Sequence, residues 1–453
     1  MRHQNVNMLS GSITKGLLGL TFPIMIVNVA QALFSIADMT VLRVFADDSA
    51  VGAVGSCTML TALCINLLVG ISVGANVVTA RHLGAGSKER AAAATTTALV
   101  FSAFGSLVLA VIGLVFAETF LRWTNCPQAL LPGAVLYFRL YFAGCPAIML
   151  YNFCSALLRA SGETKKPMYF LILGGICKLL VNLFCSAVLD IGVAGVGIAT
   201  ILSYLIAGVL CFLTILHQHD VFHLYFPHFS FHVTELKEML RVGIPAGIQN
   251  SLYALANVVI TATVNSFGEH AATGVSIANQ FDNLLYQVSI ATSLAVTPYV
   301  SQNVGAGNFK RVRQALLRAV LITTAFGAGL GALSAIFSGS LSSIMSGNPD
   351  VIRFSQQKMV IVSSTYFICG ICETLVGTLR GIGRNTIPTV ATFVFMCLLR
   401  LAWVEWVFPL CPPDLSFLYL VWPVGWVACI ITYLIVFFPA ISKLQRRQFA
   451  TQT

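Results

Sequence analysis

Charged residues are scarce in this sequence: Asp, Glu, Lys and Arg make up 9% of its 453 residues. A soluble globular domain contains about 25% charged residues, so the composition excludes that class. Hydrophobic residues make up 57%. A helix that spans a membrane needs about 20 mostly apolar residues. The apolar runs of the sequence predict twelve spans, at residues 16–43, 51–80, 92–117, 129–158, 167–189, 192–216, 243–267, 271–301, 314–340, 354–379, 388–410 and 416–440. The sequence therefore predicts an all-α polytopic membrane protein with twelve transmembrane helices.

Several chemical signatures are also missing. No P-loop sequence G-x-x-x-x-G-K-[ST] occurs, so we expect no ATP-driven step. The 13 cysteines are odd in number and mostly lie within apolar runs, which favours packed thiols over a disulfide framework. Cys369 and Cys372 form a C-x-x-C pair, but no second pair for a zinc site accompanies it. We expect no metal and no cofactor, apart from a transported proton or sodium ion.

The few charges are distributed unevenly along the chain. With a cytoplasmic amino terminus, the outer loops hold only Arg43, Arg122 and Arg353, and most other basic residues lie on the inner side. Basic residues favour the cytoplasmic side of a membrane. We therefore expect a multi-pass protein of the inner (cytoplasmic) membrane with both termini in the cytoplasm. This orientation explains the net charge of +10 without a nucleic-acid partner.

Part of the sequence recurs at a constant displacement. The residues that recur 221 positions later are Gly84, Ala85, Gly86, Arg159, Gly162 and Pro167, which become Gly305, Ala306, Gly307, Arg380, Gly383 and Pro388. Pro23 recurs as Pro245 at a displacement of 222. Two copies that each cross the membrane six times share one orientation. We therefore expect two six-helix lobes, related by an axis along the membrane normal, around a central cleft that forms the transport path.

The repeat divides the chain into three parts. We expect residues 1–216 to form the first lobe, residues 217–242 a cytoplasmic linker, and residues 243–453 the second lobe with a cytoplasmic tail. The linker contains five histidines, His217, His219, His223, His228 and His232. Because no other ligand type accompanies them, we expect solvated imidazoles rather than a metal site or a pH sensor. Residues 233–241 predict a short amphipathic helix on the inner leaflet.

Charges at the depth of the membrane need a reason, because each costs about 2.5–3.5 kcal/mol at a helix centre. Eight are expected there: Asp38, Arg139, Lys178, Asp282, Lys358, Glu373, Arg400 and Glu405. Lys358 and Glu405 lie near span ends, where their charged groups can reach the membrane surface. For Arg139 and Arg400 we expect structural contacts between helices. Asp38, Lys178 and Glu373 are the candidates for function.

Polar residues of the first lobe are expected at one level of the membrane. Asp38 follows Pro23 by 15 residues, which is about 22 Å along the first span. Asn182 in the fifth span and Thr200 in the sixth reach a similar depth, and Lys178 lies one turn below Asn182 on the same face. Asp38, Lys178, Asn182 and Thr200 form the candidate coupling-ion site, with Pro23 as a hinge. Ordinary interhelical hydrogen bonds would explain Asn182 and Thr200 equally well.

The second lobe does not repeat this acid, because Val259 and Ile260 occupy the corresponding positions. The polar candidates of its cleft are Gln249, Asn257, Asn279, Asp282 and Glu373. Glu373 either lines the cleft or pairs with a basic residue such as Arg400. The side chains that could contact an aromatic substrate are Met25, Phe34, Tyr151, Phe153, Tyr253, Phe281 and Tyr286. Packing within the protein or against lipid is the alternative interpretation of each.

These residues resemble the multidrug and toxic compound extrusion (MATE) family over essentially the whole chain. The resemblance is carried by Pro23 and Asp38, the Gly-Ala-Gly turns, the loops at 158–162 and 379–383, and the sequence 193–200. It implies a V-shaped cleft and the export of amphipathic, often cationic aromatic compounds in exchange for protons or sodium. It also implies that Asp38, Asn182 and Thr200 belong to the cation site, and that the span with Pro23 bends on protonation.

Lys178 departs from the family pattern, in which this position is usually Asn, and Asn182 stands where an acid is usual. An ammonium beside Asp38 repels sodium and attracts the carboxylate. We therefore expect Lys178 and Asp38 to form a buried ion pair that protonation breaks. This expectation favours protons over sodium as the coupling ion.

Other functional classes account for the sequence less well. A lipid or lipid-linked-sugar flippase of related architecture is the main alternative, but only Lys178, Arg139 and Arg400 are available for a cationic cleft. Residues 70–74 match the nucleophile motif G-x-S-x-G of hydrolases, yet they lie inside an apolar run, so we expect no enzyme. Their Gly-x-x-x-Gly spacing indicates close helix packing. We expect a monomer, surrounded by membrane lipids, that acts on a small amphipathic molecule.

Overall fold

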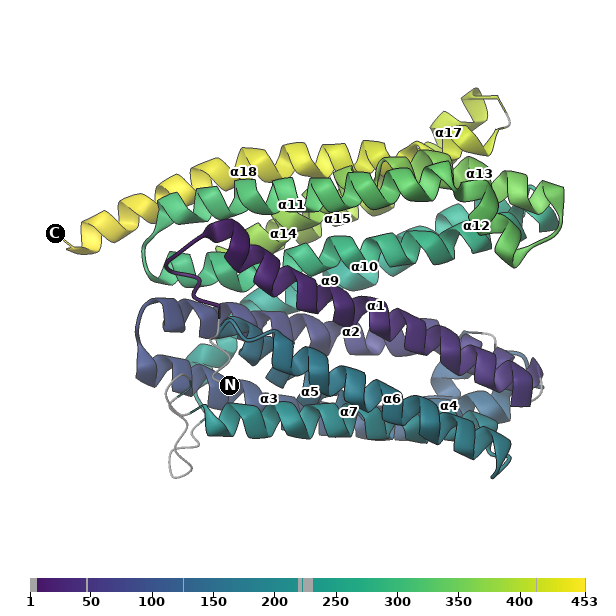
Figure 1. The fold of residues 1–453 in the computed structure, drawn as a ribbon, viewed down its shortest axis with the longest axis horizontal. Coiled ribbons are helices and arrows are strands. Elements are labelled where there is room, and N and C mark those ends of the chain that lie inside the picture. The colour runs from purple at the N-terminus through teal and green to yellow at the C-terminus, as the bar shows by residue number, and fades with distance from the viewer. Residues whose placement is uncertain are drawn as a thin grey trace. The chain divides into compact units, whose positions relative to one another are not determined.

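The computed structural model describes residues 6–45, 48–124, 126–218, 222, 231–412 and 414–452. Within these ranges every regular element is helical and no β-strand is present (Figure 1). Eight helices are long and apolar enough to cross a membrane. Two bent pairs pass the same test when each pair is counted as one span. These pairs are α4 (Leu131–Ala143) with α5 (Cys145–Ala160), and α13 (Pro349–Ser364) with α14 (Tyr366–Gly381).

Two further long helices are α9 (Val233–Asn265) and α10 (Glu269–Gly305). Together with the eight helices and the two bent pairs, they make up the expected twelve spans among the described residues. They occupy the predicted spans 243–267 and 271–301, but they are not among the ten that are apolar enough by this test. For α10 the reason is its surroundings, because it packs against α11 (Phe309–Ile336), α13 and α14. A helix that is enclosed by protein need not present apolar side chains on every face.

The chain forms two compact units, which are described separately. The first holds Ile26–Gly247, and the second holds Asn7–Met25 together with Ile248–Thr453. The division falls inside α1 (Ile13–Phe45) and inside α9, in each case two residues after a proline, Pro23 or Pro245. Proline removes a backbone hydrogen bond from a helix and favours a bend there. The lobe limits derived from the sequence repeat, at residues 216 and 243, stay a prediction.

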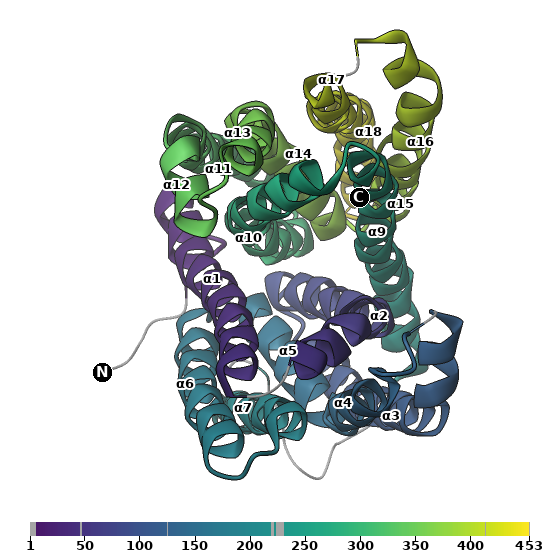
Figure 2. The same cartoon turned by 90° about the vertical axis from the view of Figure 1, so that its right-hand side faces the viewer.

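The first unit is a bundle of packed helices. Its complete elements are α2 (Asp48–Gly84), α3 (Lys88–Trp123), α4, α5, α6 (Lys165–Ala187) and α7 (Gly192–His217). Helix α7 packs along both α5 and α6, and α2 and α3 pack against each other and against α4 and α5 (Figure 2). Buried side chains of α2, α3, α4, α5 and α7 form one continuous core.

The second unit has a similar arrangement but a less regular last part. Helices α10, α11, α13 and α14 pack together, with the short α12 (Ser338–Met345) beside α13. The predicted span 388–410 consists of several segments: α15 (Thr386–Thr392), the π-helical η2 (Phe393–Leu398), α16 (Leu399–Ala402), the π-helical η3 (Trp403–Val407) and the 3₁₀ turn η4 (Phe408–Leu410). Helices α17 (Leu415–Tyr419) and α18 (Val421–Gln452) follow.

The turns after corresponding helices confirm the internal repeat. Gly86 and Gly307 have φ angles of +69° and +73°, and Gly162 and Gly383 have +89° and +79°. Each pair is separated by 221 positions. An L-residue with a side chain rarely adopts this left-handed conformation, so glycine recurs where the same turn recurs.

The glycine motif at residues 70–74 serves helix packing, as predicted. A Cβ atom at Gly70 would lie 2.2 Å from the backbone nitrogen of Gly247, and one at Gly74 would lie 2.1 Å from the carbonyl oxygen of Met239. Helix α2 and the first part of α9 therefore touch backbone to backbone within the first unit. The Ser72 hydroxyl donates to the Val69 carbonyl of its own helix at 2.6 Å.

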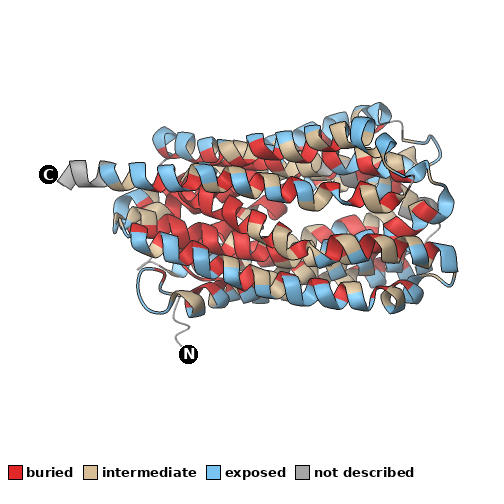
Figure 3. Cartoon of the chain, turned by 90° about the horizontal axis from the view of Figure 1, so that it is seen from above, coloured by how far each residue is buried: buried red, intermediate tan, exposed pale blue. Residues whose placement is uncertain are grey.

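Apolar side chains are exposed on the outward faces of the helices. On α3, Phe104, Val111 and Val115 are 68%, 53% and 63% exposed, whereas the buried face of the same helix carries mostly Ala, Ser and Thr. Figure 3 shows exposed residues in pale blue along these faces. An exposed apolar surface of this extent suits contact with lipid.

The linker region differs from the expectation in one respect. Residues 233–241 are helical, but they continue without a break into the rest of α9 rather than forming a separate short helix. His217 ends α7 and its Nδ1 lies 2.7 Å from the Leu213 carbonyl oxygen. His219, His223 and His228 lie outside the described residues.

Candidate functional site

A buried ion pair joins α1 and α6 in the first unit. Lys178 Nζ lies 2.5 Å from Asp38 Oδ2, and Asn182 Nδ2 donates to Asp38 Oδ1 at 3.0 Å. Lys178 and Asn182 are four residues apart, so one face of α6 supplies both partners. Asp38 is 6% exposed and Asn182 is fully buried. The buried carboxylate is bound by two donors instead of water. A change in its protonation must therefore rearrange these contacts.

Neighbouring hydroxyl groups complete this site. Ser186 Oγ donates to Asn182 Oδ1 at 3.3 Å, which orients the amide so that its NH₂ group faces Asp38. Thr200 is buried on α7, but its hydroxyl donates to the Val196 carbonyl of its own helix at 2.8 Å. The structure thus brings together Asp38, Lys178 and Asn182, while the Thr200 hydroxyl is engaged locally.

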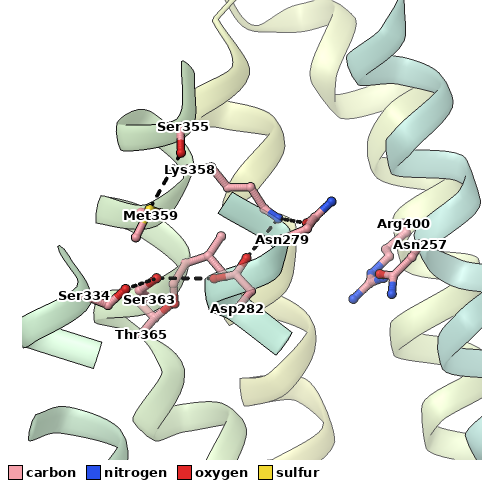
Figure 4. A network of polar contacts seen from close by, with 11 residues as sticks. Asn257, Asn279, Asp282, Ser334, Ser355, Lys358, Met359, Ser363, Thr365 and Arg400 are labelled. Atoms are coloured by element: carbon pink, nitrogen blue, oxygen red, sulfur yellow. Dashed lines mark hydrogen bonds and ion pairs between the residues drawn. The ribbon is translucent and has the colours of Figure 1, made fainter. Parts of the chain in front are cut away.

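A second buried ion pair lies in the second unit. Lys358 Nζ on α13 lies 2.9 Å from Asp282 Oδ2 on α10 and also donates to Asn279 Oδ1 (Figure 4). Ser363 Oγ donates to Asp282 Oδ1 at 3.3 Å. Asn279 and Asp282 are one turn apart on α10, so they face the same side. Each unit therefore contains a carboxylate that is bound by a lysine and lies beside an amide, at positions that the repeat does not relate.

The other three predicted residues of the second unit, Gln249, Asn257 and Glu373, do not join this group. Gln249 accepts a hydrogen bond from Arg380 Nη2 at 2.8 Å and donates to Thr392 Oγ1 at 3.0 Å. Glu373 is buried, with no basic group of the described residues within ion-pair distance. The pair between Glu373 and Arg400 that the sequence allowed is therefore absent from the described part of the chain. Asn257 instead accepts a hydrogen bond from Arg400 Nη1 at 2.7 Å.

Comparison with known proteins decides the family. The MatE family model matches residues 23–184 and 245–404, which are the two copies of the repeat. The chain belongs to the MATE family. A "Probable multidrug resistance protein YoeA" of Bacillus subtilis (strain 168) is 26% identical over 378 residues, which are 81% of each chain. An "FAD transporter" of Shewanella oneidensis is 24% identical over 406 residues, which are 87% of this chain and 88% of that protein.

Solved structures show the same MATE fold. One described as the outward-facing conformation of a multidrug resistance MATE family transporter has a TM-score of 0.91 and 20% sequence identity. The match covers 98% of this chain and all of that one. The predicted fold class is therefore confirmed, and so is the membership of a family of membrane transporters rather than of enzymes.

The expectation that Lys358 reaches the membrane surface was wrong. Lys358 is 2% exposed. Helix α13 begins at Pro349, and the side chain of Asn348 before it accepts a hydrogen bond from the Asp350 amide. Lys358 is therefore nine residues into the helix, about 13 Å from its start. An Asn before a Pro is a recognisable helix start and could have revealed this depth. Glu405 is exposed, as expected near a span end.

Arg139 also differs from the prediction. It is exposed on α4, and no carboxylate of the described residues lies within ion-pair distance of it. The preceding residue, Phe138, is fully buried and stacks on Phe142, so it lies on the buried face of α4. Apolar sequence around a charge therefore does not show which way the charge points.

The aromatic candidates fall into two groups. Tyr151 and Phe153 are buried in the core of the first unit, so packing accounts for both. Phe34 packs over Gly175, where a Cβ atom would lie 1.9 Å from the ring. The remaining candidates are partly exposed, and they are Met25, Tyr253, Phe281 and Tyr286. Tyr253 and Tyr286 are neighbours, with ring centroids 6.5 Å apart. Their contact with substrate stays a prediction.

The second ion pair gives a stability prediction. We expect Lys358→Met to destabilise the protein by about 3–5 kcal/mol, because it leaves the Asp282 carboxylate buried without its cation. The double variant Asp282→Asn, Lys358→Met should recover most of this loss, since it removes both charges. Denaturant unfolding of the purified protein in detergent measures both. A double variant as unstable as the single one would show that the pair does not stabilise the unit through its charges.

Proposed function

We propose that this MATE transporter is a proton-coupled antiporter. It exports amphipathic aromatic compounds, cationic ones among them, across the cytoplasmic membrane by alternating access, with both termini in the cytoplasm. The observation that carries the proposal is the ion pair of Asp38 with Lys178, which is buried among apolar helices and bonded to Asn182. Ionisable residues inside a membrane generally mark ion or substrate pathways, because their insertion is costly.

The pair supplies a simple exchange device. A proton that binds Asp38 removes its negative charge, so the attraction to Lys178 is lost and the carboxyl can no longer accept from both donors as an anion. Helix α1 carries both Asp38 and Pro23, so a changed contact at Asp38 is transmitted along a helix that can bend at its proline. Release of the proton on the other side restores the ion pair and resets the transporter.

The driving force is sufficient for export. One positive charge that moves through 100 mV supplies about 2.3 kcal/mol. That free energy maintains a gradient of about 40- to 50-fold for a neutral compound. No nucleotide is required, in agreement with the absence of a P-loop from the sequence.

Lys178 favours protons over sodium. Its ammonium group already contacts one carboxylate oxygen at 2.5 Å, and Asn182 donates to the other. A sodium ion would have to approach Asp38 against this fixed positive charge, and two unit charges 4 Å apart repel by about 4 kcal/mol in a protein-like medium. A proton instead binds the carboxylate directly and leaves the ammonium in place.

The relatives support export of drug-like compounds without fixing their charge. One relative is named a probable multidrug resistance protein and another an FAD transporter, and FAD is an anion. Neither name points to a lipid-linked sugar, so the flippase alternative is not favoured. We therefore take amphipathic, aromatic character as the shared property of the substrates, and cationic dyes as the first ones to test.

Sodium-free efflux tests the coupling ion. Vesicles that contain the purified protein are loaded with rhodamine 6G, and an inwardly directed proton gradient is imposed in choline chloride. We expect efflux at the same rate with and without sodium chloride, because the Lys178 ammonium excludes sodium from the site. Collapse of the proton gradient with an uncoupler should stop the efflux. Efflux that needs sodium while the proton gradient persists would overturn the proposal.

A further inference from the structure

Arg400 is a buried positive charge that has no acidic partner among the described residues. It is 3% exposed, and no carboxylate of the described residues lies within 4.0 Å of its guanidinium. Its Nη1 donates to Asn257, its Nη2 lies 4.0 Å from the weakly accepting Met396 Sδ, and its Nε has no partner. Buried charges in proteins are normally paired, because an uncompensated one costs several kcal/mol. Within the described part of the chain, Arg400 thus lacks a counter-ion.

The internal repeat shows what is missing. A displacement of 221 relates Lys178 to Leu399, and Arg400 is the next residue, so the two cations lie within one position of each other in the two copies. Each of these cations bonds to the first long helix of its own repeat. Lys178 bonds to the Asp38 carboxylate on α1, whereas Arg400 bonds to the Asn257 amide on α9. The second copy keeps the cation of the first but offers it a neutral partner.

The backbone around Arg400 is also unusual. Arg400 lies on the single turn α16, between the π-helical segments η2 and η3. By contrast, α6, which carries Lys178, is α-helical throughout. π-Helical turns are rare and occur frequently at functional sites. An arginine that served only to link two helices would not require this distortion.

The neighbours of Arg400 leave one positive charge in surplus. The Trp422 ring centroid lies 5.0 Å from Arg400 Cζ and 5.5 Å from Lys358 Nζ. Lys358 is neutralised by Asp282, but Arg400 is not. Figure 4 shows Arg400 and Asn257 together, apart from the group of Lys358, Asn279 and Asp282. The contact with Trp422 holds the guanidinium in place and takes none of its N–H donors.

We propose that Arg400 and Asn257 bind an oxyanion, a carboxylate or a phosphate, that is carried by an aromatic substrate. The Nε and Nη2 edge of the guanidinium has no strong acceptor and matches two oxygens of such a group. Asn257, which accepts the hydrogen bond from Arg400 Nη1, is exposed, so one partner of the guanidinium lies at the surface of the unit. The inference rests on the proposed export function and extends its substrates to aromatic anions and zwitterions.

Two ligands with the same ring and opposite charge test this site. Titration calorimetry is performed on the full-length protein in uncharged detergent with 2-naphthoate and with 2-naphthylmethylamine. We expect naphthoate to bind the wild type, and Arg400→Gln to weaken this binding about tenfold or more, the loss of one charged hydrogen bond. Arg400→Lys should retain part of the affinity, and the amine should bind all three proteins alike.

Two further variants separate the possible outcomes. Arg139→Gln removes an exposed arginine and should bind naphthoate as the wild type does. Asp38→Asn should also bind naphthoate, although we expect this variant not to transport. Binding and transport therefore test the anion site and the proton coupling separately, and a failure of one proposal can be told from a failure of the other. The inference is overturned if the wild type does not bind naphthoate or if Arg400→Gln binds it equally well. It is also overturned if phosphatidylglycerol displaces naphthoate, because the site would then belong to a lipid head group.

Discussion

Asp38→Asn is expected to reduce proton-driven efflux of rhodamine 6G to the level of vesicles without protein. The substitution keeps the size of the side chain and its hydrogen bond with Asn182, but it removes the carboxylate that binds and releases the proton in the proposed exchange. Lys178 then lies beside a neutral amide whatever the pH. The transporter loses the event that distinguishes its two states, because a ligand shifts an equilibrium only through a different affinity for each state.

The control for this prediction separates lost coupling from lost folding. Lys178 is left without its counter-ion in Asp38→Asn, so some loss of stability is expected. The double variant Asp38→Asn, Lys178→Met removes both charges and should unfold at a denaturant concentration near that of the wild type, yet it should remain inactive. Glu373→Gln is the matched substitution at another buried carboxylate, which has no role in the proposed exchange. Proton-driven efflux by the double variant would contradict the assignment of Asp38.

Gly70→Ala and Gly74→Ala are each expected to destabilise the first unit by about 3 kcal/mol or more. Each added methyl group would overlap a backbone atom of α9, at 2.2 Å for Gly70 and 2.1 Å for Gly74. A side chain can rotate away from such an overlap, but a helix backbone can only move as a whole. Overpacking in a core typically costs about 1–3 kcal/mol and occasionally more, and we expect these two sites to reach or exceed the upper end.

Helix α2 provides its own control for this prediction. Gly55 is exposed, and a Cβ atom there would meet nothing within 4 Å. Gly55→Ala should therefore be neutral or slightly stabilising, since alanine favours a helix by about 1 kcal/mol over glycine. The amount of monodisperse protein after detergent extraction and its thermal unfolding give the comparison. Equal behaviour of Gly55→Ala and Gly70→Ala would show that the two helices do not touch backbone to backbone.

Much of the architecture could be predicted because the membrane restricts the possibilities. Apolar runs of sufficient length must be helices there, since every backbone polar group needs an internal partner. The recurring glycine turns then revealed the two copies. Depth along a helix follows from residue number at about 1.5 Å per residue, which is why Asp38, Asn182 and Lys178 could be placed at neighbouring levels before their contact was seen.

Direction around a helix was harder to predict than depth. Arg139 and Arg400 both lie within apolar sequence, yet one is exposed and the other is buried. Which face of a helix is inside depends on its neighbours, and the spans here are apolar on both their lipid-facing and their buried sides. Lys358 was misplaced for a different reason, because the start of α13 was set five residues too late. The π-helical turns around Arg400 had no recognisable signal in the sequence.

Proton release on substrate binding tests the central claim most directly. Rhodamine 6G is added to the purified protein in a weakly buffered, sodium-free detergent solution, and the protons that enter the solution are titrated at constant pH. If the substrate favours the state in which Asp38 is ionised and paired with Lys178, the wild type releases protons and Asp38→Asn releases none while it still binds the dye. Equal proton release by both proteins would contradict the account.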